Sequence, residues 1–125
     1  MKHDDRLYLQ NILDAISAVE TYIQGLDRDG FDKNKLVQDG VIRQITIIGE
    51  AAKLLSNVLR DKYSHLPWRQ MARMRDTLIH RYFGVDLEQV WLTAQNDLPA
   101  LKAEATKILQ ELRTQEQNGD STQTT

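Results

Sequence analysis

Apolar residues recur at steps of three and four along most of the chain, and this spacing constrains the fold more than any other feature of the sequence. One such segment runs from about Asp5 to Leu26, and a longer one runs from about Asn34 to Tyr63. Steps of three and four place apolar side chains on one face of an α-helix. Because no useful length of the chain alternates with period two, the sequence predicts helices and no sheet.

Three further helical segments follow these two. The third begins at Pro67, since proline suits the first turn of a helix, and ends at Gly84. Asp86 and Gln89 have the spacing of a capping box and open a short fourth helix. The stretch 96–99, which ends in proline, is expected to break that helix and start the fifth. The sequence therefore predicts an all-α, up-and-down bundle of about five helices.

Two glycines lie inside the second helical segment. Gly40 and Gly49 each cost ~1 kcal/mol relative to alanine there, so we expect close backbone approach at these positions. The apolar face of this segment is wide enough to be buried against more than one neighbour or against a second chain.

The length of 125 residues corresponds to one domain. From Thr114 onwards the chain contains no apolar residue, and such a segment is expected to be disordered. We therefore predict a helical bundle domain over residues 1–113 and a disordered tail over residues 114–125.

Composition excludes several kinds of site. The absence of cysteine removes disulfides, cysteine-ligated zinc, iron–sulfur clusters and thiol catalysis, and it fits a reducing compartment. His3 and His65 have no companions at ligand spacing, so we predict no metal and no cofactor. No apolar run approaches the ~20 residues that cross a membrane. The N-terminus also lacks the apolar core of a secretory signal, and we expect a cytoplasmic protein with no membrane partner.

Charge is distributed unevenly along the chain. The formal net charge is -2, but the segment from Arg60 to Arg81 has six basic residues against two acidic ones, a net charge of +4. The rest of the chain therefore carries −6. A phosphate-bearing partner would be attracted to this segment. The alternative is an ordinary solvated face with scattered arginines.

The same segment contains a dense cluster of polar residues: Arg75, Asp76, His80 and Tyr82. Histidine exchanges protons near neutral pH, and arginine holds phosphate in a planar fork. Together they suit metal-free cleavage of RNA, in which a base removes the 2′-hydroxyl proton and arginine stabilises the charged phosphate. A surface pair of Asp76 with His80, a histidine favoured by the helix dipole and a structural Tyr82 remain open alternatives.

Helix geometry sets a condition on this cluster. Asp76 and His80 lie about 40° apart around a helix, whereas Arg75 and His80 lie about 140° apart. A joint site therefore needs the long reach of Arg75, a distorted last turn, or a second subunit.

The pattern of Arg75, four residues, His80, one residue and Tyr82 resembles the motif of the HepT-like toxins, a branch of the HEPN superfamily of helical ribonucleases. The segment from Ile48 to Lys53 is similar to the signature of that family's second helix. Further flanking similarity lies at Pro67-Trp68, Tyr82 to Asp86, Val90-Trp91 and Leu98-Pro99, and the resemblance covers roughly Asp5 to Leu112.

This resemblance implies a homodimer in which the motifs of both subunits face one cleft, which would meet the geometric condition. It implies the toxin of a type II HEPN/MNT toxin–antitoxin system, acting as a metal-independent RNA endonuclease with Arg75 and His80 as the catalytic pair. Asp76 matches a supporting polar position of the motif. The basic residues of the same segment, Arg69, Arg73 and Arg81, are candidates for RNA contact.

The implied antitoxin is a nucleotidyltransferase of the MNT type, and in this family it can adenylylate the motif tyrosine, Tyr82 here. Added nucleotide would place bulk and negative charge at the mouth of the cleft and repel RNA. Glu50 is either a partner of Arg75 at the cleft or a solvent-exposed glutamate.

Two other hypotheses remain open. In one, the protein is a non-catalytic helical partner of a nucleotidyltransferase, serving as substrate-binding module or scaffold. In the other, it is a helical dimer unrelated to RNA.

Overall fold

The computed structural model describes the backbone of residues 4–80 and 84–123, and the side chains of residues 4–79 and 84–117. Every regular element in these ranges is helical, which confirms the predicted all-α class. The α-helices are α1 (Asp5–Ile23), α2 (Arg28–Asp32), α3 (Lys35–Leu54), α4 (Asn57–Lys62), α5 (Trp68–His80), α6 (Leu87–Leu92) and α7 (Leu98–Gln123), with a π-helical segment, η1 (Thr93–Asp97), between the last two.

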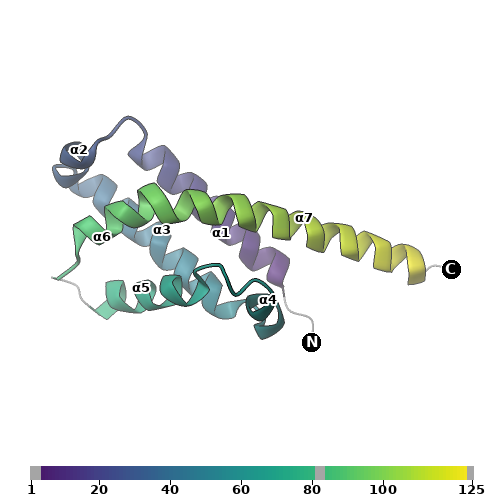
Figure 1. Cartoon of the computed structure of the whole chain (residues 1–125). Helices are drawn as coiled ribbons and strands as arrows, with labels where there is room; N and C mark the ends of the chain where they lie inside the picture. Colours follow the sequence, from purple (N-terminus) through teal and green to yellow (C-terminus); the bar gives the residue numbers. More distant parts are fainter. Residues whose placement is uncertain (1–3, 81–83, 124–125) are drawn as a thin grey trace.

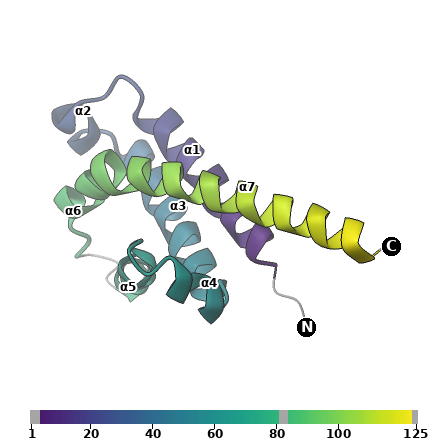
Figure 2. The same cartoon turned by 45° about the vertical axis from the view of Figure 1, so that its right-hand side comes forward.

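Three long helices form the body of the bundle, and α5 packs on its side. In Figures 1 and 2, α7 crosses over α1 and α3, and α5 lies beside α3 with α4 at its end. The apolar stripes of these helices meet in one continuous core. Its largest fully buried side chains include Leu9, Ile12, Ile16, Ile45, Ile48, Met71, Leu98 and Leu101.

The expected single helix from Asn34 to Tyr63 is wrong, because the chain turns between α3 and α4. Ser56 caps α4 by accepting a hydrogen bond from the amide of Leu59. Ser56 is itself held by Asp5, whose carboxylate accepts from the Ser56 amide at 2.8 Å and from its hydroxyl at 2.7 Å. The turn therefore depends on a contact with the first turn of α1, which the local apolar pattern does not reveal.

The expected break at residues 96–99 is also absent from the structure, where η1 joins α6 to α7 without a loop. Pro99 has no N–H to donate, and a single wide turn tolerates this better than a regular helix does. In that turn the amide of Leu98 donates to the carbonyl of Thr93. The cap predicted at Asp86 is present, since its side chain accepts from the amides of Glu88 and Gln89. The Gln89 side chain contacts Thr93 instead of reaching back.

Helix α7 extends to Gln123, and the domain boundary predicted at residue 113 stays a prediction. Glutamine, glutamate and arginine are good helix formers, and extending a formed helix costs less than nucleating one. Two contacts with α1 support the extension, an ion pair of Glu116 with Arg6 and a hydrogen bond from Arg113 to Gln10. Figure 1 shows the last turns of α7 extending beyond the other helices.

No helix in the described part of the chain is both long and apolar enough to cross a membrane.

Candidate functional site

Helices α3 and α5 approach closely at Gly49. A Cβ on Gly49 would lie 2.3 Å from the Cβ of Arg75 and 2.5 Å from the carbonyl oxygen of Met71. Both distances are too short for real atoms, so a side chain at this position would force the helices apart. The predicted close approach at Gly49 is thus confirmed. It places the Cβ of Arg75 directly against the backbone of α3.

Four charged side chains from the two helices form a network beside this contact. Arg75 Nε lies 2.8 Å from Glu50 Oε2, and Arg75 Nη1 donates to Asp76 Oδ1 at 3.0 Å. Lys53 Nζ donates to the same Asp76 oxygen at 3.0 Å. The Nε–H of Arg75 is not directed at Glu50, so that contact is an ion pair without an aligned hydrogen bond. We call Glu50, Lys53, Arg75 and Asp76 the α3–α5 charge network.

The charges of this network balance, with two acids and two bases. The hydrogen bond from Lys53, and after it the one from Arg75, hold the pKa of Asp76 below its ordinary value. Asp76 is therefore ionised at neutral pH and stays a partner of both cations. Lys53 and Arg75 share the same Asp76 oxygen.

The guanidinium of Arg75 is held in one orientation but remains partly exposed to solvent. Its side chain is 24% exposed; of its five N–H donors, one at Nη1 bonds to Asp76, and the one at Nε is buried beside Glu50. The remaining donors can bind an anion, and a guanidinium already held in place loses little freedom when it does so. This is the arrangement required of a group that stabilises charge on a phosphate.

The structure brings together three of the residues expected at the site and leaves others apart. Glu50 and Asp76 both contact Arg75. Arg69 and Arg73 are exposed on α5 and make no ion pair within the described side chains. The side chain of His80, and all of Arg81 and Tyr82, lie outside the described residues.

The backbone of α5 bears on the geometric condition for a joint site. It remains α-helical through His80, so no distorted turn brings His80 round toward Arg75 in the described part of the helix. The remaining ways to join Arg75 and His80 are the reach of the arginine and a second subunit.

Sequence reasoning missed Lys53. It follows Glu50 by three positions, which places both on neighbouring parts of one helix face. That spacing could have drawn attention to Lys53 once Glu50 was considered. Its contact with Asp76, however, depends on how α3 and α5 are rotated against each other.

The described residues contain no group of three or more histidine, cysteine, aspartate or glutamate side chains placed to hold a metal ion.

Comparison with known proteins defines the class. The family model described as "Ribonuclease HepT-like" matches residues 12–108, most of the chain. The chain therefore belongs to the HepT-like ribonuclease family.

Curated relatives agree with this assignment. The chain is 42% identical over 108 residues to "Probable ribonuclease HepT" of Thermococcus cleftensis, covering 86% of this chain and 98% of that protein. It is 40% identical over 111 residues to a "Putative RNase" of Methanocaldococcus jannaschii, covering 89% of this chain and 96% of that one.

A third relative is a longer protein. The chain is 47% identical over 112 residues to the "Gamma-glutamylcyclotransferase and putative RNase" of M. jannaschii, covering 90% of this chain but 50% of that protein. This chain thus corresponds to about half of a relative whose name describes two activities. No solved structure matches the chain at comparable significance.

Proposed function

We propose that this protein is the toxin of a type II HEPN/MNT toxin–antitoxin system and cleaves RNA endonucleolytically in the cytoplasm without a metal ion. The observation that carries the proposal is the placement of Arg75 by Gly49, Glu50 and Asp76. It supports a phosphate-binding role for the first residue of the motif in a chain that belongs to a ribonuclease family.

In the proposed reaction, His80 acts as general base and removes the proton of a ribose 2′-hydroxyl. The 2′-oxygen attacks the adjacent phosphorus, and the bond from phosphorus to the 5′-oxygen of the next nucleotide breaks. The products are a 2′,3′-cyclic phosphate and a 5′-hydroxyl, which receives a proton. Arg75 stabilises the negative charge that develops on the phosphoryl oxygens.

A homodimer would supply His80 and Arg75 to one cleft from two copies of α5. Exposed apolar side chains support such an association, because they gain from burial against a second copy. Ile79, next to His80, is 45% exposed, and Leu54 at the end of α3 is 47% exposed. These two residues lie on the helices that carry the α3–α5 charge network.

The proposed antitoxin is a small MNT-type nucleotidyltransferase. Transfer of an adenylyl group from ATP to the Tyr82 hydroxyl, with release of pyrophosphate, would add negative charge two residues beyond His80. RNA would then be repelled electrostatically and sterically.

Cleavage of RNA in EDTA by the purified protein tests the proposal. We expect the wild type to cut single-stranded RNA, and Arg75→Ala and His80→Ala each to lose about a hundredfold in rate. The matched control is Arg43→Ala, which removes an exposed arginine of α3 outside the charge network. Cleavage that requires Mg²⁺, or that survives both motif substitutions, would contradict the mechanism.

The antitoxin proposal has its own readout. Incubation with an MNT-type nucleotidyltransferase and ATP should add one adenylyl mass to the wild type and none to Tyr82→Phe. Stable binding of the nucleotidyltransferase by a protein that never cuts RNA would favour the alternative of a non-catalytic partner.

A further inference from the structure

A pocket separate from the α3–α5 charge network lies between α4 and the start of α5. Its volume is about 510 Å³, and it opens to solvent. We call it the α4–α5 pocket; its lining residues are Asn57, Arg60, Asp61, Ser64, Leu66, Trp68, Arg69 and Ala72.

Arg60 is the most informative of these residues. Its Nη2 donates to Asn57 Oδ1 at 2.6 Å, but its Nε is buried and has no hydrogen-bond partner among the described residues. A buried donor without an acceptor is unfavourable, and each such group requires an explanation. A small rotation of the guanidinium toward an anionic ligand would satisfy it.

A second guanidinium lines the same pocket. Arg69 comes from the first turn of α5 and is exposed. Asp61 is the acidic member of the lining, so the two arginines outnumber it, and Arg73 adds another positive charge one turn further along α5. The pocket therefore attracts negative charge overall, and phosphate suits the paired guanidinium groups.

The remaining lining suits the rest of a nucleotide. Asn57, Asp61 and Ser64 offer donors and acceptors to a ribose or a base edge, and Leu66 with Ala72 offers apolar surface. Trp68 is nearly fully buried and donates from Nε1 to the carbonyl of Tyr63 at 3.0 Å. It thus belongs to the fixed wall of the pocket.

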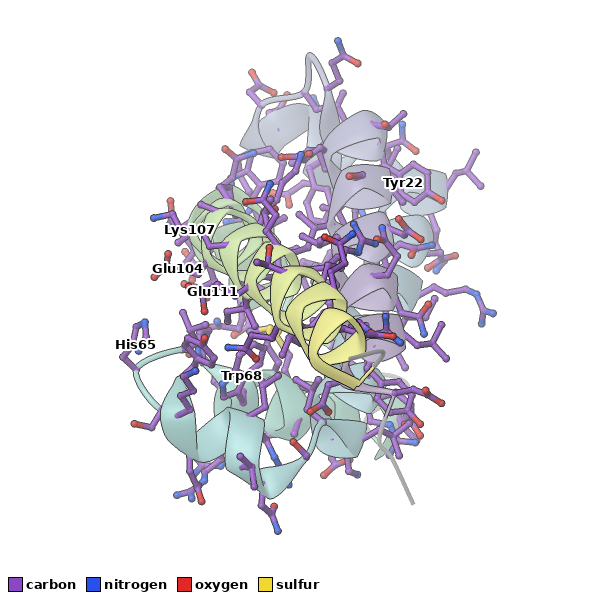
Figure 3. The ribbon with its side chains drawn as sticks, turned by 90° about the vertical axis from the view of Figure 1, so that its right-hand side faces the viewer. Tyr22, His65, Trp68, Glu104, Lys107 and Glu111 are labelled. Carbon is purple, nitrogen blue, oxygen red and sulfur yellow. The ribbon has the colours of Figure 1, made fainter. Side chains whose placement is uncertain are left out.

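The loop that forms one side of the pocket is tied to α7. Tyr63 donates from its hydroxyl to Glu111 at 2.6 Å, and His65 Nε2 lies 3.4 Å from Glu104. Figure 3 shows His65, Glu104 and Glu111 on one side of the molecule, with Trp68 below them. These ties hold the loop in place before any ligand arrives, which lowers the entropic cost of binding.

The pocket lies along α5 from the α3–α5 charge network, on the side of Asp76. Arg69, Ala72 and Asp76 follow each other at steps of three and four, so they form one stripe along α5. The rise from Arg69 to Arg75 is about 9 Å. Arg69 and Arg75 also lie about 120° apart around α5, so a strand that reaches both has to cross the helix between them.

We propose that the α4–α5 pocket binds one further nucleotide of the RNA strand, with its phosphate at Arg60 and Arg69. Its ribose or base then contacts Asn57, Asp61 or Ser64. This inference rests on the proposed ribonuclease function and identifies a second point at which the same substrate is held.

Binding of RNA to a catalytically inactive background tests the inference. In His80→Ala protein, we expect Arg60→Ala and Arg69→Ala each to weaken binding of a single-stranded oligonucleotide about tenfold, measured by fluorescence anisotropy. The slope of log K against log salt should fall by about 0.7 for each phosphate that the variant no longer binds. Arg43→Ala is the matched control and should leave the slope unchanged. Circular dichroism shows whether each variant is folded, and Arg69 is exposed, so its removal does not threaten the core.

Activity supplies the second readout. With His80 intact, Arg60→Ala and Arg69→Ala should raise KM for the long oligonucleotide more than KM for a dinucleotide, because a dinucleotide does not reach the pocket. If Arg60→Ala and Arg69→Ala show the same KM for the long oligonucleotide and the same salt slope as Arg43→Ala, the inference is overturned. The proposed ribonuclease function is unaffected by that result. A reduced salt slope in a protein that cuts no RNA would support the pocket and contradict the function. Equal affinity for AMP and for the oligonucleotide would show a free-nucleotide site and overturn the strand proposal.

Discussion

Gly49 of α3 and Arg75 of α5 are so close that a single added carbon on the glycine would lie 2.3 Å from the Cβ of the arginine. This contact fixes the separation of the two helices at the point where the α3–α5 charge network is built. Because the helices lie this close together, Arg75 Nε reaches the carboxylate of Glu50, the residue after Gly49. The glycine thus positions the proposed phosphate-binding group through helix packing.

Substitution of Gly49 by alanine should therefore destabilise the fold and lower ribonuclease activity together. Overpacking of this kind costs about 1–3 kcal/mol, since Met71 presents backbone, which cannot move aside alone. Urea unfolding followed by circular dichroism measures the loss.

Gly40→Ala is the control for that experiment. A Cβ at Gly40 would lie 3.1 Å from the ring of Tyr22, a side chain that is 39% exposed and free to shift slightly. Because alanine also favours the helix by up to ~1 kcal/mol, Gly40→Ala should be neutral or stabilising. Equal losses from the two substitutions would refute the role assigned to the Gly49 contact.

Local patterns were sufficient to predict much of this arrangement. The apolar spacing predicts the all-α bundle, and a glycine inside a long helical pattern predicts the close approach at Gly49. The sequence leaves Glu50 as either a partner of Arg75 at a cleft or a solvent-exposed glutamate; in the structure its carboxylate pairs with Arg75 and its side chain is 51% exposed.

The features missed from the sequence depend on contacts between distant segments. The turn after α3 is held by Asp5, 51 residues away from Ser56, and no local signal marks that pairing. The bond from Lys53 to Asp76 depends on the relative rotation of two helices. The helix continues from α6 through η1 into α7 because a wide π-helical turn accommodates Pro99. The proline alone predicts a break at this point.

Glu50 should act as a positioning residue for Arg75. Replacing it with glutamine removes the negative charge beside Arg75 Nε and frees the guanidinium to move away from position 50. We expect kcat for RNA cleavage to fall about tenfold, a cost of ~1.4 kcal/mol in transition-state stabilisation, with little change in KM. Glu50→Asp should restore part of the rate.

The control for this prediction is Glu20→Gln, which breaks an exposed ion pair with Lys102 on α7. It should leave kcat unaltered. An equal loss of kcat in Glu20→Gln would show a general electrostatic effect and contradict the positioning role of Glu50.

Asp5 should contribute to stability through the turn between α3 and α4. Its carboxylate accepts two hydrogen bonds from Ser56, and its removal leaves a partly buried amide and hydroxyl without that acceptor. Asp5→Ala is expected to lower the free energy of unfolding by about 1–3 kcal/mol. The adjacent Asp4 is exposed and makes no side-chain cap bond, so Asp4→Ala should stay within about 0.5 kcal/mol of wild type. Urea unfolding of the two variants compares them directly, and similar values for both would contradict the assignment.

Tyr63 should titrate later than an ordinary tyrosine. Its hydrogen bond to Glu111, together with burial and the glutamate charge, raises the pKa of Tyr63 to about 12. The folded pKa lies above the unfolded value of about 10, so the folded state holds this proton more tightly. The resulting stability is fully present below pH 10 and is lost as the pH rises toward 12.

Ultraviolet absorbance of tyrosinate against pH measures this titration among the four tyrosines of the chain. Tyr63→Phe should remove a late component with a pKa of about 12, and Glu111→Gln should move it toward the ordinary value. If the titration curve of Glu111→Gln coincides with that of the wild type, the hydrogen bond between α7 and the α4–α5 loop does not hold the Tyr63 proton. The loop beside the α4–α5 pocket would then be held to α7 only by the contact of His65 with Glu104.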